Sequence, residues 1–228
     1  MPPRLLGPRL APRSGHAPQA LVVLLHGYGA DGRDLIELGA LWGERLPGAA
    51  FLAPHAPEPC VMAPMGRQWF GYVERDDRER WTGVQAAHAA LAGYLDAELA
   101  RCGLGDDRLA LVGFSQGTMM ALHTGLRRAR APAGILGYSG LHVVPDPRLA
   151  PPESFVRPPV LLVHGDADEV VPPEALDRSL ASLRGLGIAV EGHRRPGLGH
   201  GIDPAGLQLG ADFLAAALPA AATNASQE

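Results

Sequence analysis

Short, unbroken hydrophobic runs separated by longer mixed segments are the clearest pattern in the chain. Hydrophobic and polar residues do not alternate within four of these runs, which is typical of strands that are covered on both faces, as in a parallel sheet. A fifth, more polar segment also predicts a strand. The predicted strands are LVVLL at 21–25, LALVGF at 109–114, AGILGYSG at 133–140, PVLLVHG at 159–165 and IAVEGHR at 188–194.

Segments with helical spacing lie between these strands. Residues 82–102 carry hydrophobic side chains three and four positions apart, and Gly103 follows as the expected C-terminal stop. Strands that alternate with helices and are joined by right-handed crossovers predict a doubly wound α/β fold, a mostly parallel sheet with helices on both faces. Further helices are predicted near 33–46, 116–129, 172–186 and 204–217.

Two segments do not follow this alternation. Residues 54–81 are rich in proline, glycine, methionine and aromatic residues, and a loop of this length in a compact domain is usually functional or disordered. The aromatic residues favour an ordered, functional loop. Residues 219–228 are expected to form a disordered C-terminal tail. Because no linker and no repeat divides the chain, residues 1–218 are predicted to form a single domain.

The composition narrows the class of protein. Of the 228 residues, 46% are hydrophobic and 19% are charged, and the net charge of −4 gives no general attraction to nucleic acid or to anionic membranes. No window approaches the roughly 18 consecutive apolar residues of a membrane span, and the N-terminal segment lacks the order of a signal peptide. We therefore expect a cytoplasmic protein without stable membrane insertion. Cys60 and Cys102 have no metal-ligand spacing and are expected to be free thiols.

The residues that follow the predicted strands carry the candidate chemistry, because ligands of a doubly wound sheet bind at the carboxyl ends of its strands. Ser115 stands in GFSQG directly after one strand, an acid follows a later strand within DADEVVP, and His200 follows the last strand. With 29 glycines in the chain, a GxSxG string has little weight alone. Its place between a strand and a helix, upstream of the acid and the histidine, is that of the nucleophile elbow of α/β hydrolases.

A serine hydroxyl needs a base to take its proton, and the base needs an acid that fixes its tautomer. Among nine histidines, His200 alone has a glycine-flanked loop after the last strand and a helix behind it. His88 lies on the apolar stripe of its helix and is expected to be packed there. For the acid, Asp168 is favoured over Asp166, because Asp166 follows a tight turn and is placed to bond to its own backbone.

The elbow also predicts an oxyanion hole. Gly113 and Gly117 lack the Cβ atoms that would clash in the strained turn. The Gln116 N–H begins a helix and is an unpaired donor at its positive end, and the Tyr28 N–H of HGYG is the predicted second donor. Because Gln116 is expected to act through its backbone, this hypothesis predicts that Gln116→Ala is mild and that Gln116→Pro is severe.

Six motifs follow one another over about residues 21–218, namely LLHGYGADG, APHAP, GRQWF, GFSQG, HGDADEVVP and GLGHGI. In this order and spacing they resemble the phospholipase/carboxylesterase family of α/β hydrolases, which includes acyl-protein thioesterases and bacterial carboxylesterases. The resemblance implies that Ser115 is the nucleophile, His200 the base and the second aspartate of HGDAD the acid. It also implies an oxyanion hole formed by the backbone N–H groups of Tyr28 and Gln116. Thioesterase members often have leucine in place of Tyr28, so the neighbouring acyl pocket is expected to differ.

The predicted function is that of a serine carboxylesterase, which hydrolyses small to medium acyl esters through a serine acyl-enzyme without metal or cofactor. Met62, Met65, Trp69 and Phe70 are expected to wall an apolar acyl slot; the alternative is that they only cover the edge of the sheet. No large cap domain is expected, because the segment between the strands at 133–140 and 159–165 is short and rich in proline.

Two alternative functions stay open. A lysophospholipase or an acyl-protein thioesterase would use the same chemistry with a longer acyl channel, and a non-catalytic binding module would use the fold alone. The complete set of serine, acid and histidine argues against the binding module. The expected partner is a small-molecule ester rather than nucleic acid, and the chain is expected to be a monomer or a homodimer.

Overall fold

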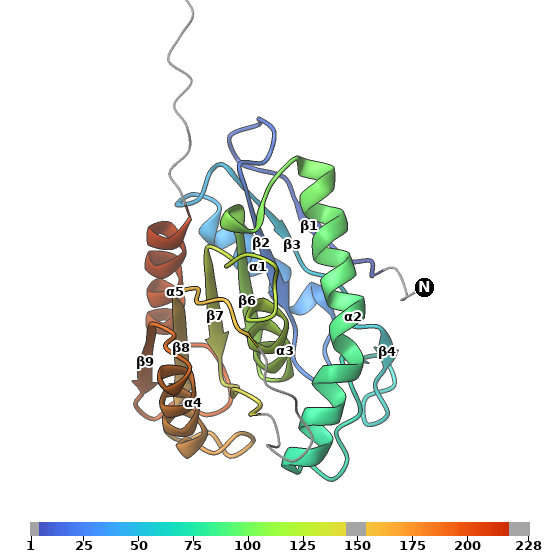
Figure 1. Cartoon of the computed structure of the whole chain (residues 1–228), viewed down its shortest axis with the longest axis vertical. Helices are drawn as coiled ribbons and strands as arrows, with labels where there is room; N and C mark the ends of the chain where they lie inside the picture. The colour runs from blue at the N-terminus through green and yellow to red at the C-terminus, as the bar shows by residue number, and fades with distance from the viewer. Residues whose placement is uncertain (1–4, 145–153, 219–228) are drawn as a thin grey trace, which may run out of the picture.

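A computed structural model of the chain describes residues 5–144 and 154–218. Its centre is a seven-stranded sheet with the strand order β1-β3-β2-β6-β7-β8-β9 (Figure 1). Strand β1 runs antiparallel to β3, and the other neighbouring strands are parallel, which confirms the predicted α/β-hydrolase fold. The strands are β1 (Arg9–Leu10), β2 (Ala20–Leu25), β3 (Ala49–Leu52), β6 (Leu109–Phe114), β7 (Gly134–Tyr138), β8 (Val160–Gly165) and β9 (Val190–Arg195).

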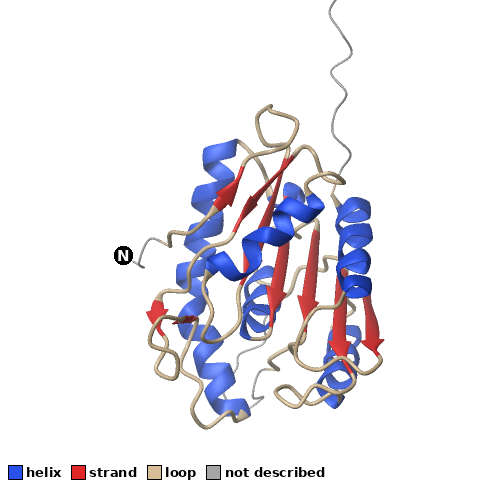
Figure 2. Cartoon of the chain, turned by 180° about the vertical axis from the view of Figure 1, so that it is seen from behind, coloured by secondary structure: helices blue, strands red, loops and turns tan. Residues whose placement is uncertain are grey.

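Helices cover both faces of the sheet. Successive strand residues point to opposite sides, and because a strand such as β2 is hydrophobic throughout, both faces must be covered. Along β2, Leu21, Val23 and Leu25 pack into one core cluster, and Val22 and Leu24 pack into the other. The first cluster is covered by α2 (Asp77–Cys102), α3 (Gln116–Gly125) and α4 (Glu174–Gly185), which lie in front of the sheet in Figure 1. The second is covered by α1 (Gly32–Trp42) and α5 (Pro204–Ala217), which Figure 2 shows from behind.

All five predicted strands are present, but β1 and β3 were not predicted. Strand β3 pairs in parallel with β2, and its four residues, AAFL, are all buried. Two of the four are alanines, which have little preference for strands, so the segment is stabilised by its position in the sheet rather than by its own sequence. Strand β1 has only two residues and a partly exposed pattern, which gives no periodic signal.

The helix over 82–102 begins earlier than predicted. The side chain of Asp76 accepts a hydrogen bond from the Glu79 N–H at 2.7 Å and caps α2, which starts at Asp77. At the other end, Gly103 has a φ of 65° and stops the helix as expected. The helix predicted over 116–129 ends at Gly125 instead.

The segment 54–81 contains a hairpin that the sequence did not predict. Strands β4 (Glu58–Pro59) and β5 (Arg67–Gln68) form a short antiparallel hairpin, and the residues after it enter the core. Cys60, beside this hairpin, and Cys102 are both free thiols, as predicted.

The segment between β7 and β8 forms no helix in the residues that are described, 139–144 and 154–159, and no large cap lies over the strand ends. The predicted tail, 219–228, lies outside the described residues. Among the helices of the described ranges, none combines the length and the apolar character needed to cross a membrane.

Candidate active site

Ser115 lies between the end of β6 and the start of α3, with a positive φ of 53° and a ψ of −116°. Such a backbone is strained by roughly 1–3 kcal/mol for a residue with a side chain. The Ser115 N–H donates to the Tyr138 carbonyl at 2.9 Å, which ties the turn to β7. A Cβ on Gly117 would lie 1.9 Å from the Leu25 carbonyl oxygen, and one on Gly113 would lie 2.4 Å from the Gly117 backbone. The turn therefore requires glycine at both positions.

Asp168 and His200 lie together at the carboxyl edge of the sheet. Asp168 Oδ2 is 2.8 Å from His200 Nδ1, and Asp168 Oδ1 accepts the Val170 and Val171 N–H groups, each at 2.9 Å. The backbone thus fixes the carboxylate, and the carboxylate holds a proton on His200 Nδ1, which leaves Nε2 as the proton acceptor of the ring. The imidazole packs on Phe114 with 4.9 Å between the ring centroids. The pair has the geometry of a base and its orienting acid.

The competing acid, Asp166, has a different partner. Its carboxylate accepts the Gly197 N–H at 2.7 Å and ties the loop after β9 to the end of β8. The expected bond to its own backbone is replaced by this bond to another segment. His164 supports Asp168 from the other side, since its Nε2 donates to the Val171 carbonyl at 2.9 Å and lies 3.3 Å from Asp168 Oδ2.

The Tyr28 and Gln116 backbones border the cleft that also contains Ser115 and His200. Within residues 5–144 and 154–218, neither of the two N–H groups donates to a protein acceptor. The Gln116 N–H stands at the N-terminus of α3, where the helix dipole adds partial positive charge. Two unpaired donors beside the serine can stabilise the oxyanion of a tetrahedral intermediate.

The cleft beside Ser115 has a volume of about 260 Å³ and mainly apolar walls. Its charged residues are Asp34 and Arg75. Sequence reasoning identified neither of them, and it also missed the aromatic and aliphatic wall. That wall is formed by the side chains of Tyr28, Tyr72, Phe114, Val170 and Val171.

The structure corrects the expected acyl wall of Met62, Met65, Trp69 and Phe70, since none of the four lines this cleft. Met62 and Met65 lie between β4 and β5, and their side chains are 75% and 94% exposed. Trp69 and Phe70 lie in the core instead, where the Trp69 indole donates to the His26 carbonyl at 3.0 Å. The two aromatic side chains therefore serve the packing of the core, which is closer to the alternative that these residues only cover the edge of the sheet.

The side chain of Gln116 has a role that the sequence did not predict. It is 1% exposed, its Oε1 accepts the Trp69 N–H at 2.9 Å, and its Nε2 donates to the Phe70 carbonyl at 2.9 Å. The first residue of α3 therefore holds the segment that follows β5 against the elbow. The only signal for this role in the sequence is that position 116 carries a glutamine, although an oxyanion donor at this position requires only the backbone N–H.

Three buried histidines are neutral and act in packing or in turns. Burial lowers the pKa of His26 and of His142 to about 4, and that of His123 to about 2. His26 donates from Nδ1 to the Gly27 carbonyl and accepts the Ala56 N–H at Nε2, so it shapes the turn after β2. In the described part of the chain, neither ring nitrogen of His123 has a hydrogen-bond partner.

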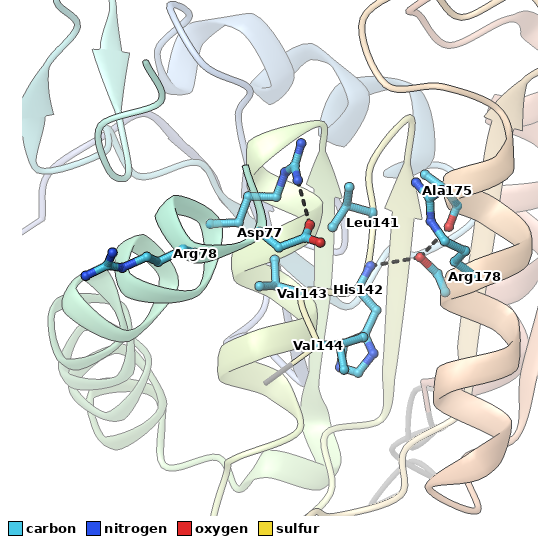
Figure 3. Close-up of a pocket in the computed structure, with 10 residues that line it drawn as sticks. Asp77, Arg78, Leu141, His142, Val143, Val144, Ala175 and Arg178 are labelled. Atoms are coloured by element: carbon cyan, nitrogen blue, oxygen red, sulfur yellow. Dashed lines mark hydrogen bonds and ion pairs between the residues drawn. The ribbon is translucent and has the colours of Figure 1, made fainter. Parts of the chain in front are cut away.

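A separate hollow of about 390 Å³ lies between the start of α2 and α4 (Figure 3). Leu141 and Val143 are on its apolar wall, and Arg78 extends away from them in this view. The His142 N–H donates to Ser179 Oγ at 2.9 Å, which fastens the segment after β7 to α4. In the described residues, the lining of this hollow does not overlap with that of the cleft beside Ser115.

Metal-binding groups are a further possibility at such an edge of the sheet. The part of the chain that the structure describes contains no group of three or more His, Cys, Asp or Glu side chains placed to hold a metal ion.

Comparisons with known proteins point to one family. The family profile described as Phospholipase/Carboxylesterase matches residues 12–218. Acyl-protein thioesterase 1 of Neurospora crassa is 30% identical over 99% of this chain and 96% of that protein, and acyl-protein thioesterase 1 of Gibberella zeae is 29% identical over 88% and 91%. The crystal structure of esterase PE8 is similar with a TM-score of 0.87 and 44% identity, covering 94% of this chain and 100% of that one.

Proposed function

The chain belongs to the phospholipase/carboxylesterase family and is a hydrolase, and from this premise we propose that it cleaves carboxylic esters of small to medium acyl groups through an acyl-enzyme on Ser115. The single observation that carries this proposal is the 2.8 Å contact between the buried Asp168 and His200, a histidine that lines the same cleft as the strained serine.

The proposed mechanism uses this chain's own side chains and backbone. His200 Nε2 takes the proton of Ser115 Oγ as the hydroxyl attacks the ester carbonyl, and then returns the proton to the leaving alcohol. Asp168 holds the imidazole in the required tautomer and stabilises the imidazolium. The Tyr28 and Gln116 N–H groups stabilise the oxyanion, and the loss of one such donor typically costs about 3 kcal/mol. Water then repeats the sequence on the acyl-enzyme and releases the acid.

The cleft supports a limit on substrate size. A volume of about 260 Å³ lies below the range of about 300–1,000 Å³ that is usual for drug-sized ligands. Its apolar walls favour the burial of an acyl chain, at about 0.8 kcal/mol for each methylene group that leaves water. We therefore propose that the catalytic efficiency rises over the first few methylene groups and then falls when the chain extends beyond the cleft.

Thioester hydrolysis is the second candidate, because two relatives that match most of this chain are named acyl-protein thioesterase 1. The same nucleophile, base and oxyanion donors would serve a thioester. Tyr28 and Tyr72, whose ring centroids are 6.2 Å apart, narrow the cleft and favour the shorter acyl groups of a carboxylesterase.

The test is a series of p-nitrophenyl esters from acetate to laurate, measured beside a thioester of matched chain length and a lysophospholipid. The proposal predicts the highest kcat/KM for a short to medium ester and much lower values for the other two classes. A higher kcat/KM for the thioester than for the ester of the same chain length would favour the second candidate. Ser115→Ala is the control, and hydrolysis that persists in this variant would rule out both.

A further inference from the structure

We propose that Arg75 is a specificity-determining residue that binds a carboxylate at the far end of the substrate's acyl group. This inference rests on the esterase function proposed above and extends it to a substrate class, esters whose acyl chain ends in a carboxylate. Arg75 lines the cleft beside Ser115, and its guanidinium carbon lies 5.7 Å from the centroid of the Tyr72 ring. An arginine at the end of an apolar cleft is a natural receptor for a planar carboxylate.

The backbone around Arg75 is held in a specific shape. Arg75 has a positive φ of 57°, which is uncommon for a residue with a side chain. The Glu79 carboxylate accepts the Val73 and Arg75 N–H groups, each at 2.7 Å, and thereby fixes the turn before α2. Residues with a strained backbone cluster at active sites, ligand clamps and switch regions. This turn keeps the arginine beside Tyr72.

The guanidinium of Arg75 is available for a ligand. Within residues 5–144 and 154–218 it has no ion pair with a carboxylate, whereas Arg80 pairs with Asp77 at 2.7 Å. Arg80 also donates from Nε to the Tyr72 hydroxyl at 2.9 Å, which fixes the ring on which both arginines lie. The nearby Asp76 accepts a backbone N–H as the cap of α2. Asp76, Asp77 and Glu79 are therefore engaged with other partners.

The direction of the cleft places the positive charge of Arg75 near the acyl end of the substrate rather than near the leaving alcohol. His200 must face the leaving alcohol in order to protonate it, and its ring lies on Phe114. The proposed oxyanion donor of Tyr28 lies next to the carbonyl, and the Tyr28 ring leads to Tyr72, 6.2 Å away. An acyl chain that runs past these two tyrosines ends at Arg75.

One opposing charge lines the same cleft. Burial raises the pKa of the Asp34 carboxyl, and the neighbouring Asp31 raises it further. A carboxylate ligand is attracted by Arg75, and the ionised form of Asp34 repels it, which favours binding of the carboxylate beside Arg75. Because Arg75 is exposed to solvent, we expect a moderate effect that weakens with added salt.

The test compares p-nitrophenyl hydrogen adipate with p-nitrophenyl hexanoate, two esters of equal acyl length that differ in the terminal carboxylate. In Arg75→Gln we expect kcat/KM for the adipate ester to fall about three- to tenfold, mainly through KM, because one charge-assisted contact is lost. The value for the hexanoate ester should stay within about twofold of wild type. Arg75→Lys should retain part of the preference, since it keeps the charge but not the planar fork.

Arg78→Gln is the matched control, because it also removes one positive charge. Arg78 lies on α2 and lines the separate hollow between α2 and α4 instead of the cleft beside Ser115 (Figure 3). Equal losses in the two glutamine variants would show a long-range field and overturn the proposal. 4-Acetoxybenzoate carries the carboxylate on the leaving group, and an Arg75-dependent loss as large as that for the adipate ester would overturn the assignment to the acyl end.

Failure of this inference differs from failure of the proposed function. If wild type hydrolyses the hexanoate ester and Arg75→Gln affects the two esters alike, Arg75 is not a specificity determinant and the esterase function stands. If wild type hydrolyses neither ester, the proposed function itself is wrong.

Discussion

Gln116→Ala is expected to destabilise the protein strongly, although the sequence predicted a mild effect. The buried Gln116 side chain makes two hydrogen bonds of 2.9 Å, one from the Trp69 N–H and one to the Phe70 carbonyl. The substitution leaves both backbone groups buried without a partner, and each costs about 1–3 kcal/mol. The free energy of unfolding should fall by about 2–5 kcal/mol, a large part of the 5–15 kcal/mol that is typical of a domain.

Gln116→Ala should also displace a backbone donor of the proposed oxyanion hole. The Trp69 indole donates to the His26 carbonyl at 3.0 Å, two residues before the proposed donor of Tyr28. When the Trp69 segment is released, the turn that carries the Tyr28 N–H loses this support. We expect kcat to fall about tenfold, less than the 10²–10³-fold typical of removing a donor outright, because the N–H is displaced but still present.

Urea unfolding and the rate of p-nitrophenyl ester hydrolysis measure the two effects. Gln116→Met is the control for volume, because methionine fills a similar space but makes neither hydrogen bond. It should lose nearly as much stability as Gln116→Ala if the hydrogen bonds dominate. A free energy of unfolding within about 0.5 kcal/mol of wild type in Gln116→Ala, together with an unchanged kcat, would refute this reasoning.

Three further changes probe other parts of the structure. Asp168→Asn should lower kcat by about 10³–10⁴-fold and Asp166→Asn should have little effect on kcat, because only the first acid holds the base; similar rates would contradict the assignment. Gly117→Ala should prevent stable folding, since its Cβ would lie 1.9 Å from a carbonyl oxygen of β2, whereas Gly185→Ala meets nothing within 4 Å and should keep the wild-type Tm. Burial lowers the pKa of His123 to about 2. Below the ordinary pKa of 6.5, the unfolded chain therefore binds a proton that the folded chain does not, and the free energy of unfolding decreases as the pH is lowered. When the pH is lowered from 6.5 to 4.5, the free energy of unfolding of His123→Leu should therefore decrease by about 2–3 kcal/mol less than that of wild type. Urea unfolding at the two pH values measures this difference, and equal decreases in the two proteins would contradict the prediction.

The features that the sequence predicted depend on local signals. The turn around Ser115 is specified by Gly113 and Gly117 and by the strand and helix on either side. The order of serine, acid and histidine after successive strands brings Asp168 and His200 to one edge, because parallel strands end at the same side of a sheet. Periodicity and chain order were sufficient for these features.

The features that the sequence did not predict depend on contacts between distant segments. The composition of residues 54–81 indicates an apolar, ordered segment, but it does not reveal that the hairpin turns Met65 outward and sends Trp69 into the core. That choice is made by hydrogen bonds from Trp69 to Gln116 and to His26, which lie far away along the chain. The two charged residues of the cleft, Asp34 and Arg75, were missed for the same reason.

The most direct test of the central claim is to map the residue that a fluorophosphonate ester modifies, by mass spectrometry of the inactivated protein. We expect one phosphonyl adduct on Ser115, formed in step with the loss of esterase activity, and no adduct in a folded Ser115→Ala variant. An adduct on another residue, or full inactivation of the protein without modification of Ser115, would contradict that claim.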